Sequence, residues 1–168
     1  MGHGNTPEIT FGLNLGANYK QFDFAILFQG ASNFDMYLSQ ESAWAFFNGG
    51  KVFDDHLGRA QIGSDGNVIN TDASYPRLSL SNNAVNEQTS SYWLVAGDYI
   101  RLKNIELGYS LPQTVLTKLG LDQFRLYASG RNLFTSSDIK HLDPENPQQR
   151  GWFYPQQKVL TIGINVSL

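Results

Sequence analysis

Residues 158–168, KVLTIGINVSL, alternate between apolar and polar or small side chains. Successive side chains of an extended chain point to opposite faces, so this period-two pattern predicts a β-strand. The apolar face of the strand would consist of Leu160, Ile162, Ile164, Val166 and Leu168. Such a face promotes aggregation when a strand edge is exposed to water, whereas in a bilayer it forms an ordinary lipid-facing wall. The segment therefore predicts a strand of a membrane-spanning β-barrel.

The same alternation occurs near the start of the chain, in residues 10–19, TFGLNLGANY. Asn14 and Asn18 occupy the polar phase of this segment, although asparagine is a poor strand former in a water-soluble sheet. Both are better explained by a strand whose second face lines a wet lumen. The apolar phase, which we expect to face lipid, includes Phe11, Leu13 and Leu15.

Residues 22–30 repeat the pattern, with Phe24 and Ile26 on the expected lipid-facing side. The short polar break at Lys20-Gln21 predicts a hairpin in which the apolar faces of the two strands match. Three further segments alternate in the same way. The complete set of predicted strands is residues 10–19, 22–30, 98–110, 124–131 and 158–168.

The strand predicted at 98–110 changes phase near Lys103-Asn104, because the apolar residues before and after this pair would point to opposite faces. A β-bulge there would restore a single apolar face. After this strand, residues 114–119 are predicted to form a helical turn that Gly120 ends. In the next strand, Arg125 and Arg131 share one face and need water or acidic partners, which a lumen supplies.

The connections between the predicted strands run short, long, short, long. Transmembrane barrels have short periplasmic turns and long extracellular loops, so residues 31–97 and 132–156 are predicted to be extracellular. Within the first loop, residues 40–47 are predicted to form a short helix. The expected fold class is all-β, with antiparallel transmembrane β-barrel strands and long extracellular loops.

The composition limits other function classes. Charged residues make up 16% of the chain, below the value of about 25% for a typical soluble domain. The net charge of −3, without a long basic run, argues against a nucleic-acid partner, and the absence of cysteine excludes thiolate zinc sites. No apolar run is long enough for a transmembrane helix. Residues 1–6 lack the apolar core of a signal peptide, so if the barrel prediction is right we expect the natural N-terminus to lie far upstream.

Several short motifs follow one another along nearly the whole chain. They are Asn5-Thr6-Pro7, Phe11-Gly12, Tyr19-Lys20, Phe22-Asp23, Tyr75-Pro76-Arg77, residues 99–105 (YIRLKNI), residues 107–112 (LGYSLP), residues 130–134 (GRNLF) and Asp143-Pro144-Glu145. Each motif is weak alone. In this order the motifs resemble the C-terminal barrel strands of the SusC/RagA family, the TonB-dependent transporters of Bacteroidota outer membranes.

The resemblance implies a fold and a function. Members of this family are similar in having barrels of about 22 strands with an N-terminal plug. They import oligosaccharides or peptides with energy transmitted by TonB, and a SusD-like lipoprotein usually caps the extracellular face. Residues 1–168 would be the C-terminal part of such a barrel in the cell outer membrane, without the plug and the TonB-contacting segment. No catalytic residue and no cofactor are implied, and we expect the isolated chain to be neither a stable barrel nor a transporter.

Six aromatic side chains in the two predicted loops are candidates for contact with substrate or with the lipoprotein lid. Aromatic rings stack on sugar faces and anchor protein interfaces. Alternatively, these rings pack the loops onto one another. Contact with the lid or packing of the loops is favoured over direct contact with substrate. The six residues are Trp44, Phe46, Phe47, Trp152, Phe153 and Tyr154.

Two weaker hypotheses concern the acidic residues of the loops. Asp138, Asp143 and Glu145, together with His141, are a calcium candidate because their oxygen ligands cluster in sequence. The favoured alternative is a proline-rigidified turn that packs the loop. The run Asp54-Asp55-His56 suggests a metal site, for which a solvated loop is the favoured explanation.

Two other functions remain as alternatives to the importer. A soluble β-sandwich or lipocalin-like binding protein would use the same alternation with its apolar faces turned inward. A glycoside hydrolase would need an inward pair of carboxylates, for which Asp143 and Glu145 are the candidates.

Overall fold

The computed structural model describes residues 2–81, 83–146, 148 and 150–168. The chain divides into two compact units. The sheet unit contains residues 7–33, 97–138 and 155–168, and the loop unit contains residues 1–6, 34–96 and 139–154. No helix in the described part of the chain is long and apolar enough to cross a membrane.

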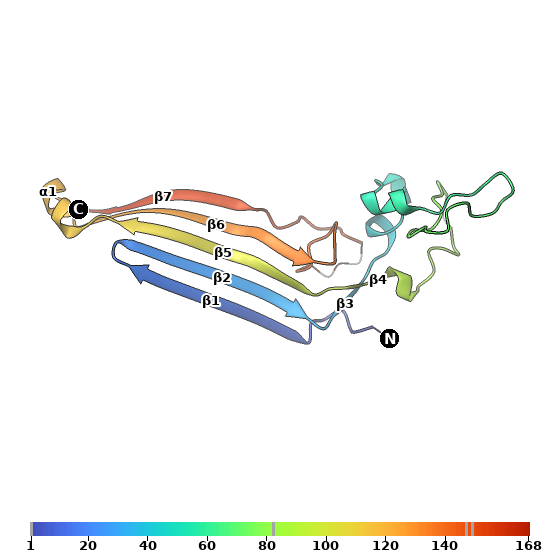
Figure 1. Ribbon diagram of the computed structural model, residues 1–168, viewed down its shortest axis with the longest axis horizontal. Helices are drawn as coiled ribbons and strands as arrows, with labels where there is room; N and C mark the ends of the chain where they lie inside the picture. The colour runs from blue at the N-terminus through green and yellow to red at the C-terminus, as the bar shows by residue number, and fades with distance from the viewer. Residues whose placement is uncertain (1, 82, 147, 149) are drawn as a thin grey trace. The chain divides into compact units, whose positions relative to one another are not determined.

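Five long strands form the sheet unit, and every neighbouring pair is antiparallel (Figure 1). The spatial order is β1-β2-β5-β6-β7. The strands are β1 (Ile9–Tyr19), β2 (Phe22–Ser32), β5 (Tyr99–Ser110), β6 (Gln123–Ser137) and β7 (Val159–Ser167). All five lie where alternation predicts a strand, and the all-β antiparallel fold class is confirmed.

Strand β6 extends beyond its predicted end at residue 131. Asn132 has a positive φ of 52°, and the pairing with β5 passes from Arg131 opposite Asn104 to Phe134 opposite Leu102. This irregularity interrupts the alternation, so the residues after it do not continue the earlier pattern. The prediction that the second long connection begins at residue 132 is therefore wrong, since residues 132–137 belong to β6.

The predicted β-bulge in the third long strand is present in β5. Leu102 lies opposite Phe28 and Phe134, and Asn104 lies opposite Leu27 and Arg131, so Lys103 falls outside the register on both sides. The extra residue turns the following part of the strand over. As a result, the apolar residues before and after the bulge lie on the same face of the sheet.

The register joins the apolar phases of all five strands into one continuous face. Directly opposed residues of antiparallel strands share a face, so the apolar residues of neighbouring strands lie in common cross-strand rows. One row runs through Leu15, Ile26, Ile105, Gly130 and Leu160, and another through Tyr19, Phe22, Tyr109, Leu126 and Ile164. None of the described residues covers this face over β7, where Ile162 is 81% exposed.

The opposite face of the sheet is polar and contains an ion cluster that spans three strands. The side chain of Arg125, on β6, extends across β5 toward β2. Its Nη2 donates to Glu106 Oε1 of β5 at 2.7 Å, and its Nε donates to Asp23 Oδ1 of β2 at 3.0 Å. A second bond joins Nη2 to the other carboxylate oxygen of Asp23. The guanidinium passes over Gly108, where a methyl group would collide with both Arg125 and Asp23.

The two short connections of the sheet unit lie at one end of the strands. The first is the Lys20-Gln21 turn, in which Lys20 has a φ of 54°. The second contains helix α1 (Gln113–Leu119), which ends at Gly120 with a left-handed φ of 68°. The predicted helical turn at 114–119 is therefore confirmed. Strand β2 ends, and strand β5 begins, at the opposite end of the sheet.

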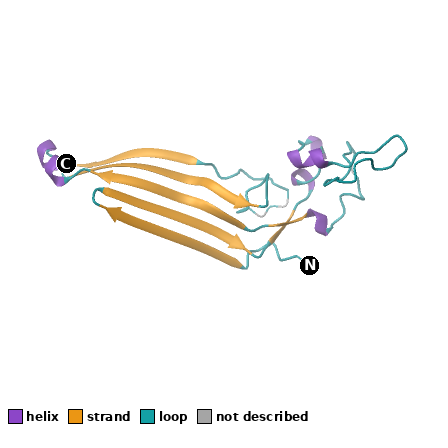
Figure 2. Cartoon of the chain, viewed as in Figure 1, coloured by secondary structure: helices purple, strands orange, loops and turns teal. Residues whose placement is uncertain are grey.

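The loop unit is a folded body rather than a structureless connection (Figure 2). The sequence predicts a long loop with one short helix over residues 31–97, but β2 extends to Ser32 and a small antiparallel pair follows, β3 (Asp35–Tyr37) and β4 (Leu94–Ala96). Short 3₁₀ turns make up most of the remaining regular structure: η1 (Gln40–Ser42), η2 (Phe47–Gly49), η3 (Asp54–Gly58) and η4 (Ser91–Trp93). Phe34, Met36, Trp93 and Ile139 are buried and form its apolar core.

The single short helix predicted over residues 40–47 is wrong. The structure contains two separate turns, η1 and η2, on either side of Phe46. Phe46 has a φ of 63°, in the left-handed region, and a right-handed helix cannot continue through such a residue. The spacing of the aromatic residues in this segment favours a helix, but the reversal of the backbone at Phe46 prevents one.

We expect Gly108→Ala to destabilise the full-length protein by about 1–3 kcal/mol, because the added methyl group displaces charge-assisted hydrogen bonds of Arg125. Gly16→Ala is the matched control on the same polar face, since a methyl group there would lie 3.6 Å from Phe24 O, an ordinary contact. Denaturant unfolding of both variants in detergent micelles measures the difference. Equal losses for the two variants would show that Gly108 has no special role.

Candidate functional site

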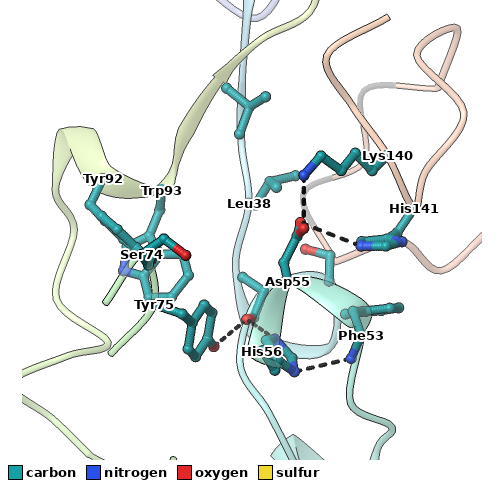
Figure 3. Close-up of a pocket in the computed structure, with 13 residues that line it drawn as sticks. Leu38, Phe53, Asp55, His56, Ser74, Tyr75, Tyr92, Trp93, Lys140 and His141 are labelled. Carbon is teal, nitrogen blue, oxygen red and sulfur yellow. Dashed lines mark hydrogen bonds and ion pairs between the residues drawn. The ribbon is translucent and has the colours of Figure 1, made fainter. Parts of the chain in front are cut away.

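A cavity of about 350 Å³ lies within the loop unit (Figure 3). We call it the aromatic cavity. Its walls come from five parts of the loop unit: the β3 region, the end of the η1 turn, the η3 turn, the stretch from Ser74 to β4, and the start of residues 139–154. The side chains that give it chemical character are Phe53, Asp55, His56, Tyr75, Tyr92, Trp93, Lys140 and His141.

One wall of the aromatic cavity is built from tyrosine and tryptophan rings. The η4 turn presents Tyr92 and Trp93, whose ring centroids lie 4.7 Å apart in an edge-to-face arrangement. Tyr75 contacts Trp93 edge-on at 5.9 Å. Hydrogen bonds to backbone carbonyls fix the orientation of this wall, from Tyr92 Oη to Ser74 O at 2.7 Å and from Trp93 Nε1 to Asn86 O at 3.0 Å.

The floor of the cavity is organised around the backbone carbonyl of Ala43. Tyr75 Oη donates to this oxygen at 2.7 Å, and His56 Nε2 lies 3.3 Å from it. The Phe53 N–H donates to His56 Nδ1 at 3.1 Å, so Nδ1 is unprotonated and the hydrogen of the neutral ring is on Nε2. Burial lowers the pKa of His56 and raises the pKa of Tyr75 to about 12, so both rings are neutral near pH 7.

The rim of the cavity is charged. Lys140 Nζ lies 2.8 Å from Asp55 Oδ1, and His141 Nε2 lies 3.4 Å from Asp55 Oδ2. The His141 ring stacks on Phe53 with centroids 4.5 Å apart. The hydrogen bond from Lys140 holds the pKa of Asp55 below its usual value and raises the pKa of Lys140. Residues 139–154 are thereby joined to the η3 turn of the first long connection.

A second ion pair joins the same two segments away from the cavity. Arg150 donates to both oxygens of Glu41, from Nε at 2.9 Å and from Nη2 at 2.8 Å. These bonds, helped by Asn48, lower the pKa of Glu41 to about 2. The Arg150 guanidinium also lies 3.7 Å from the centre of the Trp152 ring. The carboxylate is therefore charged near pH 7.

Similar proteins were found by sequence and by structure, although no family model matches the chain. TonB-dependent receptor P3 of Formosa agariphila is 30% identical over 184 residues, which cover 96% of this chain and 16% of the relative. TonB-dependent receptor SusC of Bacteroides thetaiotaomicron is 27% identical over 169 residues, covering 95% of this chain and 15% of the relative.

Among solved structures, the RagAB peptide importer in its closed-closed state aligns with a TM-score of 0.74 and 26% identity. The alignment covers 100% of this chain and 18% of that one. The chain is a barrel portion of a SusC/RagA-type TonB-dependent receptor. The resemblance of the sequence motifs to this family is thereby confirmed. The chain spans only part of the curated relatives it matches, for example 16% of the length of TonB-dependent receptor P3.

None of the six aromatic residues singled out in the receptor sequence lines the aromatic cavity. Trp44 packs edge-on against Phe47 at 5.2 Å and borders a smaller space beside Tyr75 and Trp93. Phe46, Trp152 and Tyr154 are exposed, and Phe153 is half-buried. Their contact with substrate or lid stays a prediction.

Three residues that line the cavity, Asp55, His56 and His141, were candidates in the sequence only for metal sites, and its aromatic wall was not predicted. Tyr75 stood in the Tyr75-Pro76-Arg77 motif, and Tyr92-Trp93 is an adjacent aromatic pair within a polar stretch. Either feature marks a place where a loop buries aromatic surface. Neither feature indicates that both segments meet Phe53 and His56, because that contact depends on the folding of the whole loop unit.

The acidic candidates for a metal site are not brought together. Asp138 belongs to the sheet unit, while Asp143 and Glu145 belong to the loop unit. Asp143 Oδ1 accepts the Glu145 backbone N–H at 3.0 Å, a local turn contact. Within the described ranges, no group of three or more His, Asp or Glu side chains is placed to hold a metal ion. In Asp54-Asp55-His56, both histidine nitrogens already contact the backbone.

We expect the loop unit to lose stability as the pH falls below about 6.5, the ordinary pKa of histidine. Burial lowers the pKa of His56 in the folded state. Below about pH 6.5 the unfolded state therefore binds a proton at this residue more readily than the folded state does, and protonation favours unfolding. Hydrogen exchange of the η3 amides in the full-length receptor at pH 7.5 and 5.5 measures the effect. His56→Gln should flatten the pH dependence, while the exposed His3→Gln should keep it. An unchanged slope in His56→Gln would assign the dependence to another group.

Proposed function

We propose that this chain supplies part of the barrel wall and two extracellular loops of an outer-membrane importer of oligosaccharides or peptides, energised through TonB. One observation carries the proposal: the β-bulge and the cross-strand register place all five apolar phases on one face of the sheet and the polar phases on the other. A lipid-facing exterior and a wet lumen require this separation.

The apolar face is proposed to contact lipid in the outer membrane. Its side chains are uncovered in the chain itself, and no second layer of sheet or helix in the described residues packs on them. A soluble β-sandwich or lipocalin-like binder would bury these residues in its own core. The proposed lipid-facing residues are Phe11, Leu13, Leu15, Phe24, Ile26, Leu160, Ile162, Ile164, Val166 and Leu168.

The loop unit is proposed to lie on the extracellular side and to meet a SusD-like lipoprotein. Its segments leave the sheet from the end opposite to the short turns, as expected for extracellular loops of a barrel. Trp152 and Tyr154 are exposed large side chains, suited to a contact with another protein. The plug and the contact with TonB would come from the remainder of the full-length protein.

Uptake by the native host tests the importer. Cells with the intact gene should accumulate labelled oligosaccharides or labelled peptides, and deletion of the gene, of its TonB or of an adjacent SusD-like lipoprotein gene should reduce accumulation. Uptake that persists without TonB would contradict the proposal. Recovery of the full-length protein in soluble form without detergent would favour the binder instead.

We expect Ile164→Arg to destabilise the full-length barrel by about 2–4 kcal/mol, because a charge near the bilayer midplane must leave water. Asn165→Arg, on the opposite face of the same strand, should have little effect because it would reach the lumen. Unfolding in lipid vesicles compares the two variants. Equal damage from both would mean that the assignment of the faces is wrong.

A further inference from the structure

We infer that the aromatic cavity of the loop unit binds one sugar ring of a neutral oligosaccharide. The inference rests on the proposed function and deepens it, since it names the substrate class and the residues of a subsite. The residues that form the subsite come from the η3 turn, Tyr75, the η4 turn and the Lys140–His141 segment.

The size and walls of the cavity suit a small ring. Its volume of about 350 Å³ is at the lower end of the range for small-molecule sites, which is about 300–1,000 Å³. The edge-to-face arrangement of Tyr92 and Trp93 fixes two aromatic rings at one wall (Figure 3). Aromatic faces pack well against the C–H surfaces of sugars, which are apolar although the ring is surrounded by hydroxyl groups.

The hydrogen-bonding groups favour a ligand that donates as well as accepts. The hydroxyl protons of Tyr75 and Tyr92 are both committed to backbone carbonyls. Their oxygens can therefore only accept a hydrogen bond from a ligand. At the rim, Lys140 has further N–H groups beyond the one that contacts Asp55, and its side chain is 66% exposed. A sugar hydroxyl both donates and accepts, so it satisfies acceptors in the wall and donors at the rim.

The charges at the rim favour a neutral ligand. Asp55 and Lys140 form an ion pair of no net charge. A ligand carboxylate attracted to Lys140 would meet Asp55, and a ligand ammonium attracted to Asp55 would meet Lys140. Each charged group of a peptide would thus gain one favourable contact and one repulsive contact. An apolar peptide side chain in the cavity would leave the Tyr92 phenol oxygen without a donor, which is unfavourable when water is displaced.

The floor of the cavity is fixed before a ligand binds. Ala43 O, His56 and the Phe53 N–H form a closed set of backbone and side-chain contacts. A binding site that is ordered in advance loses less conformational entropy when the ligand enters. The cavity therefore does not need the lipoprotein lid to acquire its shape, and binding should be measurable with the receptor alone.

The test uses the purified full-length receptor in detergent on an array of neutral oligosaccharides, with an array of short peptides in parallel. Oligosaccharides retained on the array are then titrated by calorimetry. Tyr92→Ala should weaken binding by roughly tenfold, the effect of losing one aromatic contact of about 1.4 kcal/mol. Tyr92 is 49% exposed, so its truncation does not open the buried core. Tyr92→Phe, which removes only the phenol oxygen, should weaken binding less than Tyr92→Ala.

Leu57→Ala is the control, because Leu57 belongs to the η3 turn, is 74% exposed and does not line the cavity. It should bind as the unaltered receptor does. Retention of peptides only, no retention on either array, or oligosaccharide affinity equal in Tyr92→Ala and the unaltered receptor would overturn the inference. None of these results bears on TonB-dependent uptake in cells, so the subsite can fail while the proposed importer stands.

Discussion

The structure of this chain depends on the period of two in its strands. A bilayer offers no partners for backbone N–H and C=O groups, so each strand must pair fully with its neighbours. Full pairing fixes the register, and the register fixes which side chains share a face. A slip of one residue in any pair would move apolar side chains to the polar face of the sheet and polar ones to the apolar face. The bulge at Lys103 shows that the constraint holds, because it inserts one residue at the place where the sequence changes phase.

On the polar face, side-chain hydrogen bonds also connect the strands. The Arg125 cluster connects β6, β5 and β2, and it can do so only because Gly108 leaves the space above β5 empty. Glycine weakens a strand by its flexibility, and here that loss is offset by contacts across the face. A similar arrangement occurs on β7, where the ring of Tyr127 covers Gly163, the residue directly opposite it. Both glycines are therefore positions at which a long side chain from a neighbouring strand lies flat on the sheet.

The sheet could be predicted from the sequence because its signal is local. Residues 10–19 and 158–168 each show their alternation without reference to any other segment. Prediction failed where one residue with a positive φ broke the local pattern, at Asn132 within β6 and at Phe46 between two turns. The aromatic cavity could not be predicted for a different reason. Phe53, Tyr75, Trp93 and His141 are far apart in sequence, and no periodicity connects them.

The loop unit is held together mainly by aromatic packing, although its ion pairs are the more conspicuous contacts. Lys140 and Asp55 are largely exposed, and pairs of this kind contribute about 0–1 kcal/mol because water screens them. The Phe53–His141 stack excludes water between the two connections, and the Tyr75–Trp93 contact does so within the first connection. The ion pairs instead decide which residues of the two segments meet. A long connection that folds in this way presents a fixed surface, and a fixed surface can recognise a ligand at a smaller entropic loss than a flexible one.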